Sequence, residues 1–124
     1  MKIVKVILLS LIAVGLVFSF AFAAGDVAKG KALFNDQKFA GGTAGKSCNS
    51  CHPDGKGLEK SGMKKEFNLG GMKQTSLKEA VNTCITMALK GKALDPKSQE
   101  MKDMVAYIKS LEKKTPAAKT KGKE

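Results

Sequence analysis

The feature that most constrains this chain is a five-residue segment near its middle. Two cysteines stand three residues apart, and a histidine directly follows the second: Cys48-Asn49-Ser50-Cys51-His52. Side chains three residues apart are neighbours on one face of a helix, so the spacing brings the two thiols together. The histidine is the single one in the chain. Two thiols and an imidazole are therefore collected at one place, and the rest of the fold must form around the group that they hold.

The pattern C-x-x-C-H is the attachment motif of c-type haem. It predicts one covalent haem c, bound through thioethers at Cys48 and Cys51, with His52 as the proximal axial iron ligand. Three alternatives compete with it. A disulfide could join Cys48 to Cys51 in an oxidising compartment. A redox dithiol would need a βαβ setting, which the sequence lacks. A zinc site would have only Cys84 or a carboxylate as its fourth ligand.

The first 23 residues have the layout of a secretory signal peptide. Lys2 and Lys5 give a basic start, no charged residue occurs over positions 6–22, and Ala-Phe-Ala occupies positions 21–23. This arrangement is typical of a cleaved signal. We therefore expect a protein that begins at Ala24 and is located in the periplasm or on the outer face of the cytoplasmic membrane. The alternative is an uncleaved membrane anchor, because the apolar stretch is nearly long enough to span a bilayer.

The remainder of the chain is long enough for one compact domain, predicted over residues 24–112. Residues 113–124 are rich in lysine and have no apolar face, which predicts a disordered tail. The chain has 22 basic residues against 11 acidic ones, and every basic residue is lysine. Without arginine, specific nucleic-acid recognition is disfavoured. The charge instead favours an acidic redox-partner protein that docks on a lysine-rich face, with membrane contact only if the signal stays attached.

Apolar spacing predicts three helices. The first covers residues 26–36 with Asp26 as its N-cap. The second follows a cap at Thr75 or Ser76, with Glu79 in a capping box, and ends at Gly91. The third opens at Pro96 and carries an apolar stripe over residues 101–111. Residues 39–47 are predicted to form a glycine-rich loop, whereas residues 59–71 receive no assignment. Because no run alternates at period two, the predicted fold class is all-α.

Together these features resemble a class I c-type cytochrome domain. In that family an N-terminal helix with a glycine and an aromatic residue crosses a C-terminal helix, and the pairs Gly30 with Phe34 and Tyr107 with Leu111 match the two. The resemblance implies a small helical domain around one haem that carries single electrons and is not itself an enzyme. One departure concerns the proline whose carbonyl usually accepts the proximal histidine's N–H. The only nearby proline here is Pro53, which leaves that acceptor unidentified.

The distal axial ligand has two candidates, Cys84 and Met87. Met87 lies near the position of the class I methionine ligand, whereas Met101 and Met104 lie on the helix stripe and are assigned to the core. Residues 81–94 are similar to haem domains of sulfur-oxidising cytochromes of the SoxA and thiosulfate dehydrogenase type. That resemblance implies a Cys84 thiolate on the iron, and with it an alternative function as the haem subunit of an enzyme that oxidises reduced sulfur compounds. A haem protein with a free distal position is a third possibility.

Overall fold

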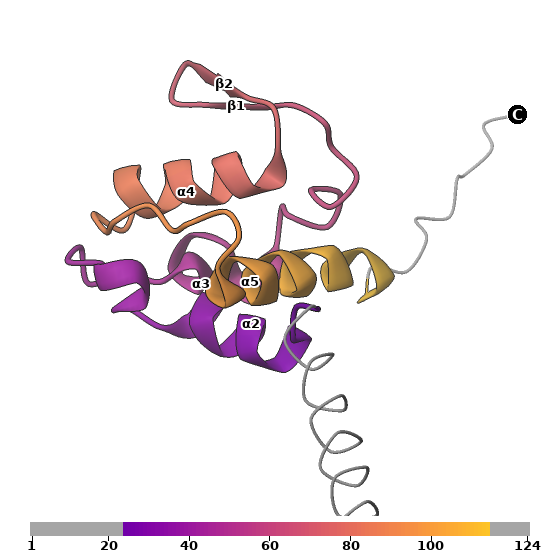
Figure 1. Cartoon of the computed structure of the whole chain (residues 1–124), viewed down its shortest axis with the longest axis horizontal. Helices are drawn as coiled ribbons and strands as arrows, with labels where there is room; N and C mark the ends of the chain where they lie inside the picture. Colours follow the sequence, from indigo (N-terminus) through magenta and orange to yellow (C-terminus); the bar gives the residue numbers. More distant parts are fainter. Residues whose placement is uncertain (1–23, 115–124) are drawn as a thin grey trace, which may run out of the picture.

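The computed structural model describes residues 24–114, so the predicted signal peptide (1–23) and most of the predicted tail (115–124) lie outside the described residues. In chain order its elements are α2 (Val27–Asn35), η2 (Phe39–Gly41), α3 (Cys48–Cys51), η3 (Pro53–Gly55), β1 (Phe67–Leu69), β2 (Met72–Gln74), α4 (Leu77–Met87), α5 (Gln99–Ser110) and η4 (Leu111–Lys114). Figure 1 shows α2 packed against α5, α4 on the other side of α5, and the β1–β2 hairpin beyond α4. No helix within residues 24–114 is long and apolar enough to cross a membrane.

Helices α2 and α5, the first and last α-helices of the domain, cross and pack against each other. A Cβ atom on Gly30 would overlap the backbone oxygen of Asp103 and come within 2.8 Å of the Tyr107 Cβ, so only glycine allows this close approach. Beside it the rings of Phe34 and Tyr107 pack edge to face, with centroids 5.1 Å apart. The crossing predicted from these residues is confirmed.

The core is built mainly from α4 and α5. Met101 and Met104 are fully buried, as predicted. Around them lie the other buried apolar side chains of the cluster: Phe34, Phe39, Val81, Ile85, Leu89, Tyr107, Ile108 and Leu111. Since side chains three and four residues apart share one helix face, the burial pattern follows from the helical spacing of these residues.

Two helix boundaries differ from the predicted ones. Helix α5 begins at Gln99 and not at Pro96, because Ser98 is its N-cap and accepts the Met101 N–H. Helix α4 ends at Met87, before the predicted stop at Gly91. The chain turns through Lys90, whose φ is 55°, and Gly91 then lies so near the Ala40 oxygen that a Cβ atom would stand 2.7 Å from it.

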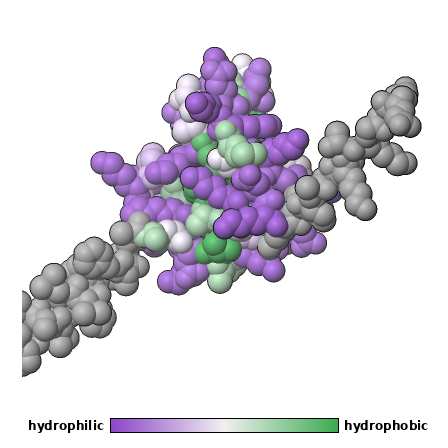
Figure 2. Space-filling model, turned by 90° about the vertical axis from the view of Figure 1, so that its right-hand side faces the viewer, coloured by the Kyte–Doolittle hydropathy of each residue, from purple (hydrophilic) through white to green (hydrophobic). Residues whose placement is uncertain are grey.

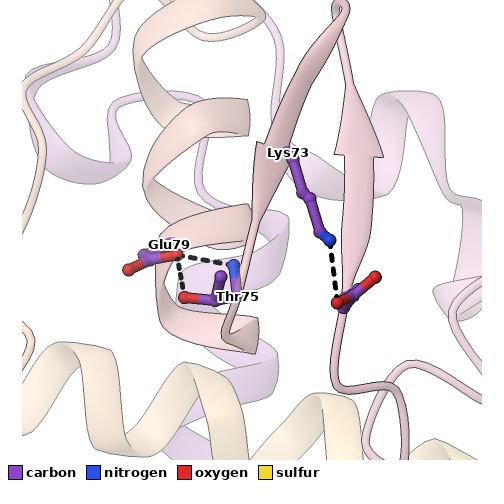
Figure 3. A network of polar contacts seen from close by, with 4 residues as sticks. Lys73, Thr75 and Glu79 are labelled. Carbon is purple, nitrogen blue, oxygen red and sulfur yellow. Dashed lines mark hydrogen bonds and ion pairs between the residues drawn. The ribbon is translucent and has the colours of Figure 1, made fainter.

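The prediction of a purely helical fold needs a correction, because residues 67–74 form a small antiparallel hairpin. Phe67 pairs with Gln74 and Leu69 with Met72, and Gly70 and Gly71 form the turn with positive φ. Each strand has three residues, which is too short for a period-two pattern to be recognised. Lys73 makes an ion pair of 2.9 Å with Glu66 at the start of the hairpin (Figure 3).

The hairpin leads directly into the capped start of α4. Ser76 accepts the Glu79 N–H at 3.2 Å. The Glu79 carboxylate accepts the N–H and hydroxyl of Thr75 at 2.7 and 3.0 Å (Figure 3). The predicted cap at Ser76 is therefore confirmed, with the glutamate reaching back to Thr75. These contacts fix the angle at which α4 leaves the hairpin.

Candidate functional site

The C-x-x-C part of the motif forms the short helix α3, which is capped by the serine directly before it. Ser47 is the N-cap, and its N–H donates to the Ser50 hydroxyl at 3.0 Å. The predicted attachment residues thus lie on one helical turn, with Cys48 half-buried and Cys51 exposed. His52 follows as the C-cap of this turn and is half-buried.

These residues face a cavity of about 250 Å³ between α3, the hairpin and the inner faces of α4 and α5. Its functional side chains come from separate elements: Cys48, Cys51 and His52 from the motif and Cys84 from α4. The walls are mainly apolar and include Phe34, Leu58, Phe67, Leu69, Leu77, Ala80, Val81, Ala88, Leu89, Met104 and Ile108. The fold therefore brings three thiols and one imidazole to a single apolar space.

The imidazole of His52 is oriented by a backbone carbonyl. Its Nδ1 lies 3.1 Å from the oxygen of Lys56. A carbonyl can only accept, so Nδ1 carries the proton and Nε2 keeps its lone pair. The sequence left the acceptor for this N–H unidentified, and the structure provides it four residues after the histidine. This is the tautomer that a histidine needs in order to bind a metal through Nε2.

The two candidates for the distal ligand lie in different surroundings. Cys84 lines the cavity, whereas Met87 does not. Met87 is 45% exposed, and its side chain lies against the hairpin turn, where a Cβ on Gly70 would stand 2.6 Å from its terminal methyl group. Met63 and Met72 are also exposed. No methionine other than Met104 lines this cavity, among the residues that the structure describes.

The thiols influence one another electrostatically. Burial, followed by the nearby Cys84, raises the pKa of Cys48 to about 11. Burial also raises the pKa of Cys84, with a further contribution from Cys51. The three cysteines are free of disulfides. Within residues 24–114 no group of three or more His, Cys, Asp or Glu side chains is placed to hold a metal ion together.

One polar edge of the site was not predicted, because it lies in and beside the segment that received no assignment. Ser61 is buried and lines the cavity together with Lys64. Gln74 is 5% exposed, and its Oε1 has no hydrogen-bond partner among the described residues. Gln74 is directly opposite Phe67 in the hairpin, so both side chains project from the face of the hairpin that borders the cavity. Nothing in the local sequence pattern distinguishes these residues from ordinary surface residues.

Comparison with known families agrees with this geometry. Residues 29–117 match the model of the SoxA/TsdA cytochrome c domain, which covers well over half of the chain. Neither a curated protein nor a solved structure matches the chain.

A cytochrome c domain implies covalently bound haem c, and the residues of the cavity fit that group. The apolar walls suit a macrocycle, and the motif supplies two thiols for its vinyl groups and an imidazole with a free Nε2. The polar edge fits as well, because the carboxylates of a haem need hydrogen-bond donors such as the Ser61 hydroxyl and the Lys64 ammonium. An apolar cavity with one polar side is the arrangement that an amphipathic ligand requires.

Proposed function

Because this chain belongs to the SoxA/TsdA cytochrome c domain family, we propose that it is an exported one-electron carrier whose haem c is attached through Cys48 and Cys51. The observation that carries the proposal is the shared cavity: both attachment thiols, the proximal histidine candidate His52 and a third sulfur, Cys84, line one apolar space. The predicted signal peptide supports export, because c-type haem is attached outside the cytoplasm.

When bound, the haem supplies an iron that alternates between the ferric and ferrous states. The chain's own residues supply burial, orientation and ligation. The apolar walls exclude water, which limits the reorganisation that accompanies a change of charge. His52 is held with Nδ1 protonated and Nε2 available. No side chain is required to move a proton during electron transfer.

For the distal position we propose Cys84 and not Met87. The support is positional: the Cys84 thiol lines the cavity, and Met87 lies outside it against the hairpin turn. The raised pKa of the Cys84 thiol is no obstacle, because coordination to a metal deprotonates a thiol. An anionic ligand stabilises the ferric state, so the reduction potential is expected to be lower than with a methionine ligand.

An optical spectrum of the protein matured with the c-type haem machinery tests both proposals. We expect covalent haem that is low-spin when ferric and lacks the near-infrared band of iron–methionine bonding. Cys84→Ser should change the ferric spectrum, whereas the matched variant Met87→Leu should leave it unchanged. Absence of covalent haem would overturn the central proposal. A methionine band that disappears in Met87→Leu would overturn the assignment of Cys84.

A second candidate function is oxidation of a reduced sulfur compound, with this chain as the haem subunit. Two observations favour it: the family match and the position of Cys84 beside the attachment thiols. Thiosulfate should then reduce the haem of the isolated protein or of its complex, and Cys84→Ser should abolish that reduction while Met87→Leu does not. Haem reduction that continues at the normal rate in Cys84→Ser would contradict this function.

For the electron carrier we propose an acidic redox partner that docks on lysine-rich surface. The face in Figure 2 is dominated by hydrophilic residues around small apolar areas. Lys64 stands at the cavity itself, with Lys60 and Lys65 exposed in the same segment. Charge of one sign around a redox centre steers an oppositely charged partner into a transient complex. Substituting Lys60 and Lys65 by glutamine should slow exchange with such a partner more than substituting Lys97 and Lys102 of the α5 region.

A further inference from the structure

Asn49 is one of the two variable residues inside the C-x-x-C-H motif, and the structure gives its side chain a defined contact. Its Oδ1 accepts the backbone N–H of Asp54 at 2.8 Å. Asp54 has a φ of 52°, in the left-handed region that residues with a Cβ seldom adopt. A half-buried side chain of the motif thus stabilises an unfavourable backbone conformation five residues further along the chain.

That conformation belongs to the turn that brings Lys56 to His52. After Asp54 the turn continues through Gly55, with a φ of 80°, and two backbone bonds close it: Gly55 N–H to the His52 oxygen at 2.9 Å and Lys56 N–H to the Pro53 oxygen at 3.0 Å. The Lys56 carbonyl then lies 3.1 Å from Nδ1 of His52. Gly55 has no room for a side chain, because a Cβ there would overlap Leu111.

We propose that Asn49 is a positioning residue for the proximal iron ligand. By holding Asp54, it keeps the Lys56 carbonyl on the Nδ1–H of His52. That hydrogen bond fixes the plane of the ring and makes Nε2 a stronger donor to iron. The inference rests on the proposed function in one respect, namely that His52 ligates a haem iron.

The proposal differs from a merely structural role for Asn49. A structural role would lower the stability of the domain and leave the His52 hydrogen bond intact. Loss of a positioning residue weakens the hydrogen bond between His52 and the Lys56 carbonyl, so the Nδ1 proton exchanges faster with water. The ferrous state of the haem also becomes more stable relative to the ferric state. The reduction potential would then rise, because a less basic imidazole stabilises ferric iron less.

The test uses the haem-bearing full chain, labelled with nitrogen-15, in its diamagnetic ferrous state. The variant is Asn49→Leu, which keeps the approximate size of the side chain and removes the acceptor. Nuclear magnetic resonance should show exchange of the His52 Nδ1 proton that is about tenfold faster than in the wild type, the factor expected for loss of one ordinary hydrogen bond. Spectroelectrochemical titration should show a higher reduction potential. Asn49→Ala is measured in parallel. It provides the same comparison if the Asn49→Leu variant does not acquire haem.

Two matched variants complete the design. Asn49→Asp retains an acceptor oxygen and should keep wild-type proton exchange. Lys56→Ala removes the side chain but keeps the carbonyl, and should also leave exchange unchanged. Nδ1 exchange within about twofold of wild type in Asn49→Leu would overturn the positioning role, even if the melting temperature falls. Failure of the wild type to carry haem would instead overturn the proposed function, so the two failures are distinguishable.

Discussion

At the scale of single residues, Gly30 shows how one missing atom sets the distance between two helices. A Cβ at this position would occupy the space of the Asp103 backbone oxygen, which cannot move without displacing α5. The site depends on this contact indirectly. Helix α5 supplies Met104 and Ile108 to the cavity wall, so a shift of α5 against α2 changes the cavity that we propose holds the haem.

We therefore expect Gly30→Ala to be strongly destabilising. In an ordinary helix, replacing glycine by alanine raises the free energy of unfolding. Here the overlap with the Asp103 backbone should reverse the sign of that change. We expect a loss of about 3 kcal/mol, at the upper end of the range for overpacked sites. Chemical denaturation measures it. Lys31→Ala, at the exposed neighbouring position, should change stability by less than about 0.5 kcal/mol. A stabilised Gly30→Ala variant would contradict the close crossing.

Asp103 is the second residue on which the helix pair depends. It is 4% exposed, and its Oδ1 accepts the Asp26 N–H and the Gln99 side-chain amide, each at 2.7 Å. Gln99 in turn donates to the Ala24 oxygen at 3.0 Å. One buried carboxylate thus connects the start of α2 to the first turn of α5.

Asp103→Ala should remove the acceptor of two part-buried N–H donors, those of Asp26 and Gln99, and lower the free energy of unfolding by about 1–2 kcal/mol. Asp103→Asn keeps an acceptor oxygen at the same place and should lose less. The comparison is made by thermal denaturation of the two variants in the same haem-loaded state. Equal losses would indicate that charge, and not the pair of hydrogen bonds, is the stabilising factor.

At the scale of elements, the junction between the hairpin and α4 determines where Cys84 lies. Glu79 is held by Thr75, and these hydrogen bonds lower its pKa below the ordinary value of 4.5. Because the pKa is lowered in the folded state, the carboxylate stabilises folding at pH values above 4.5. That contribution is lost as the pH falls through the lowered pKa of the folded state.

Glu79→Gln should therefore melt at a lower temperature than the wild type at neutral pH, and the difference should shrink as the pH is reduced from about 6 to about 3. Ser76→Ala is the matched control. It removes an uncharged cap worth about 1 kcal/mol, so its deficit should not change over the same pH range. Melting curves over this range measure both, and a Glu79→Gln deficit that is independent of pH would contradict the role of the charge.

At the scale of the whole molecule, excess positive charge is the dominant property. The chain has a formal net charge of +11. Within residues 24–114 one ion pair is formed, between Lys73 and Glu66, with both side chains 64% exposed. Most lysines of this region therefore leave their charge unneutralised by a close carboxylate, and their summed field extends over about a Debye length, roughly 10 Å at 0.1 M salt.

The rate of electron exchange with small charged reagents should depend on this electrostatic field. With ferricyanide, an anionic oxidant, the bimolecular rate should fall as ionic strength increases, by about tenfold or more between 10 mM and 1 M salt. With a cationic ruthenium hexaammine reagent of the same size class, the rate should rise instead. Stopped-flow absorbance at a haem band measures both. Equal salt dependence for the two reagents would contradict electrostatic steering.

The features that the sequence alone determined are local. The caps at Asp26 and Ser76 and the buried stripe of Met101 and Met104 follow from interactions within a helical turn, which spacing encodes directly. The close crossing at Gly30 could also be anticipated, through resemblance to a known helix pair. The signal peptide and the iron ligands remain predictions.

Which groups share the cavity depends on tertiary packing and could not be predicted from local sequence. Cys84 and Met87 are three residues apart, or about 60° around a helix, so spacing cannot tell which one faces inward. The packing of α4 against α5 and the hairpin turned Cys84 toward the cavity and left Met87 at the surface. Likewise, the Lys56 carbonyl became the partner of His52 through a turn with left-handed residues. A backbone acceptor cannot be recognised from the amino-acid sequence, because every residue has the same carbonyl.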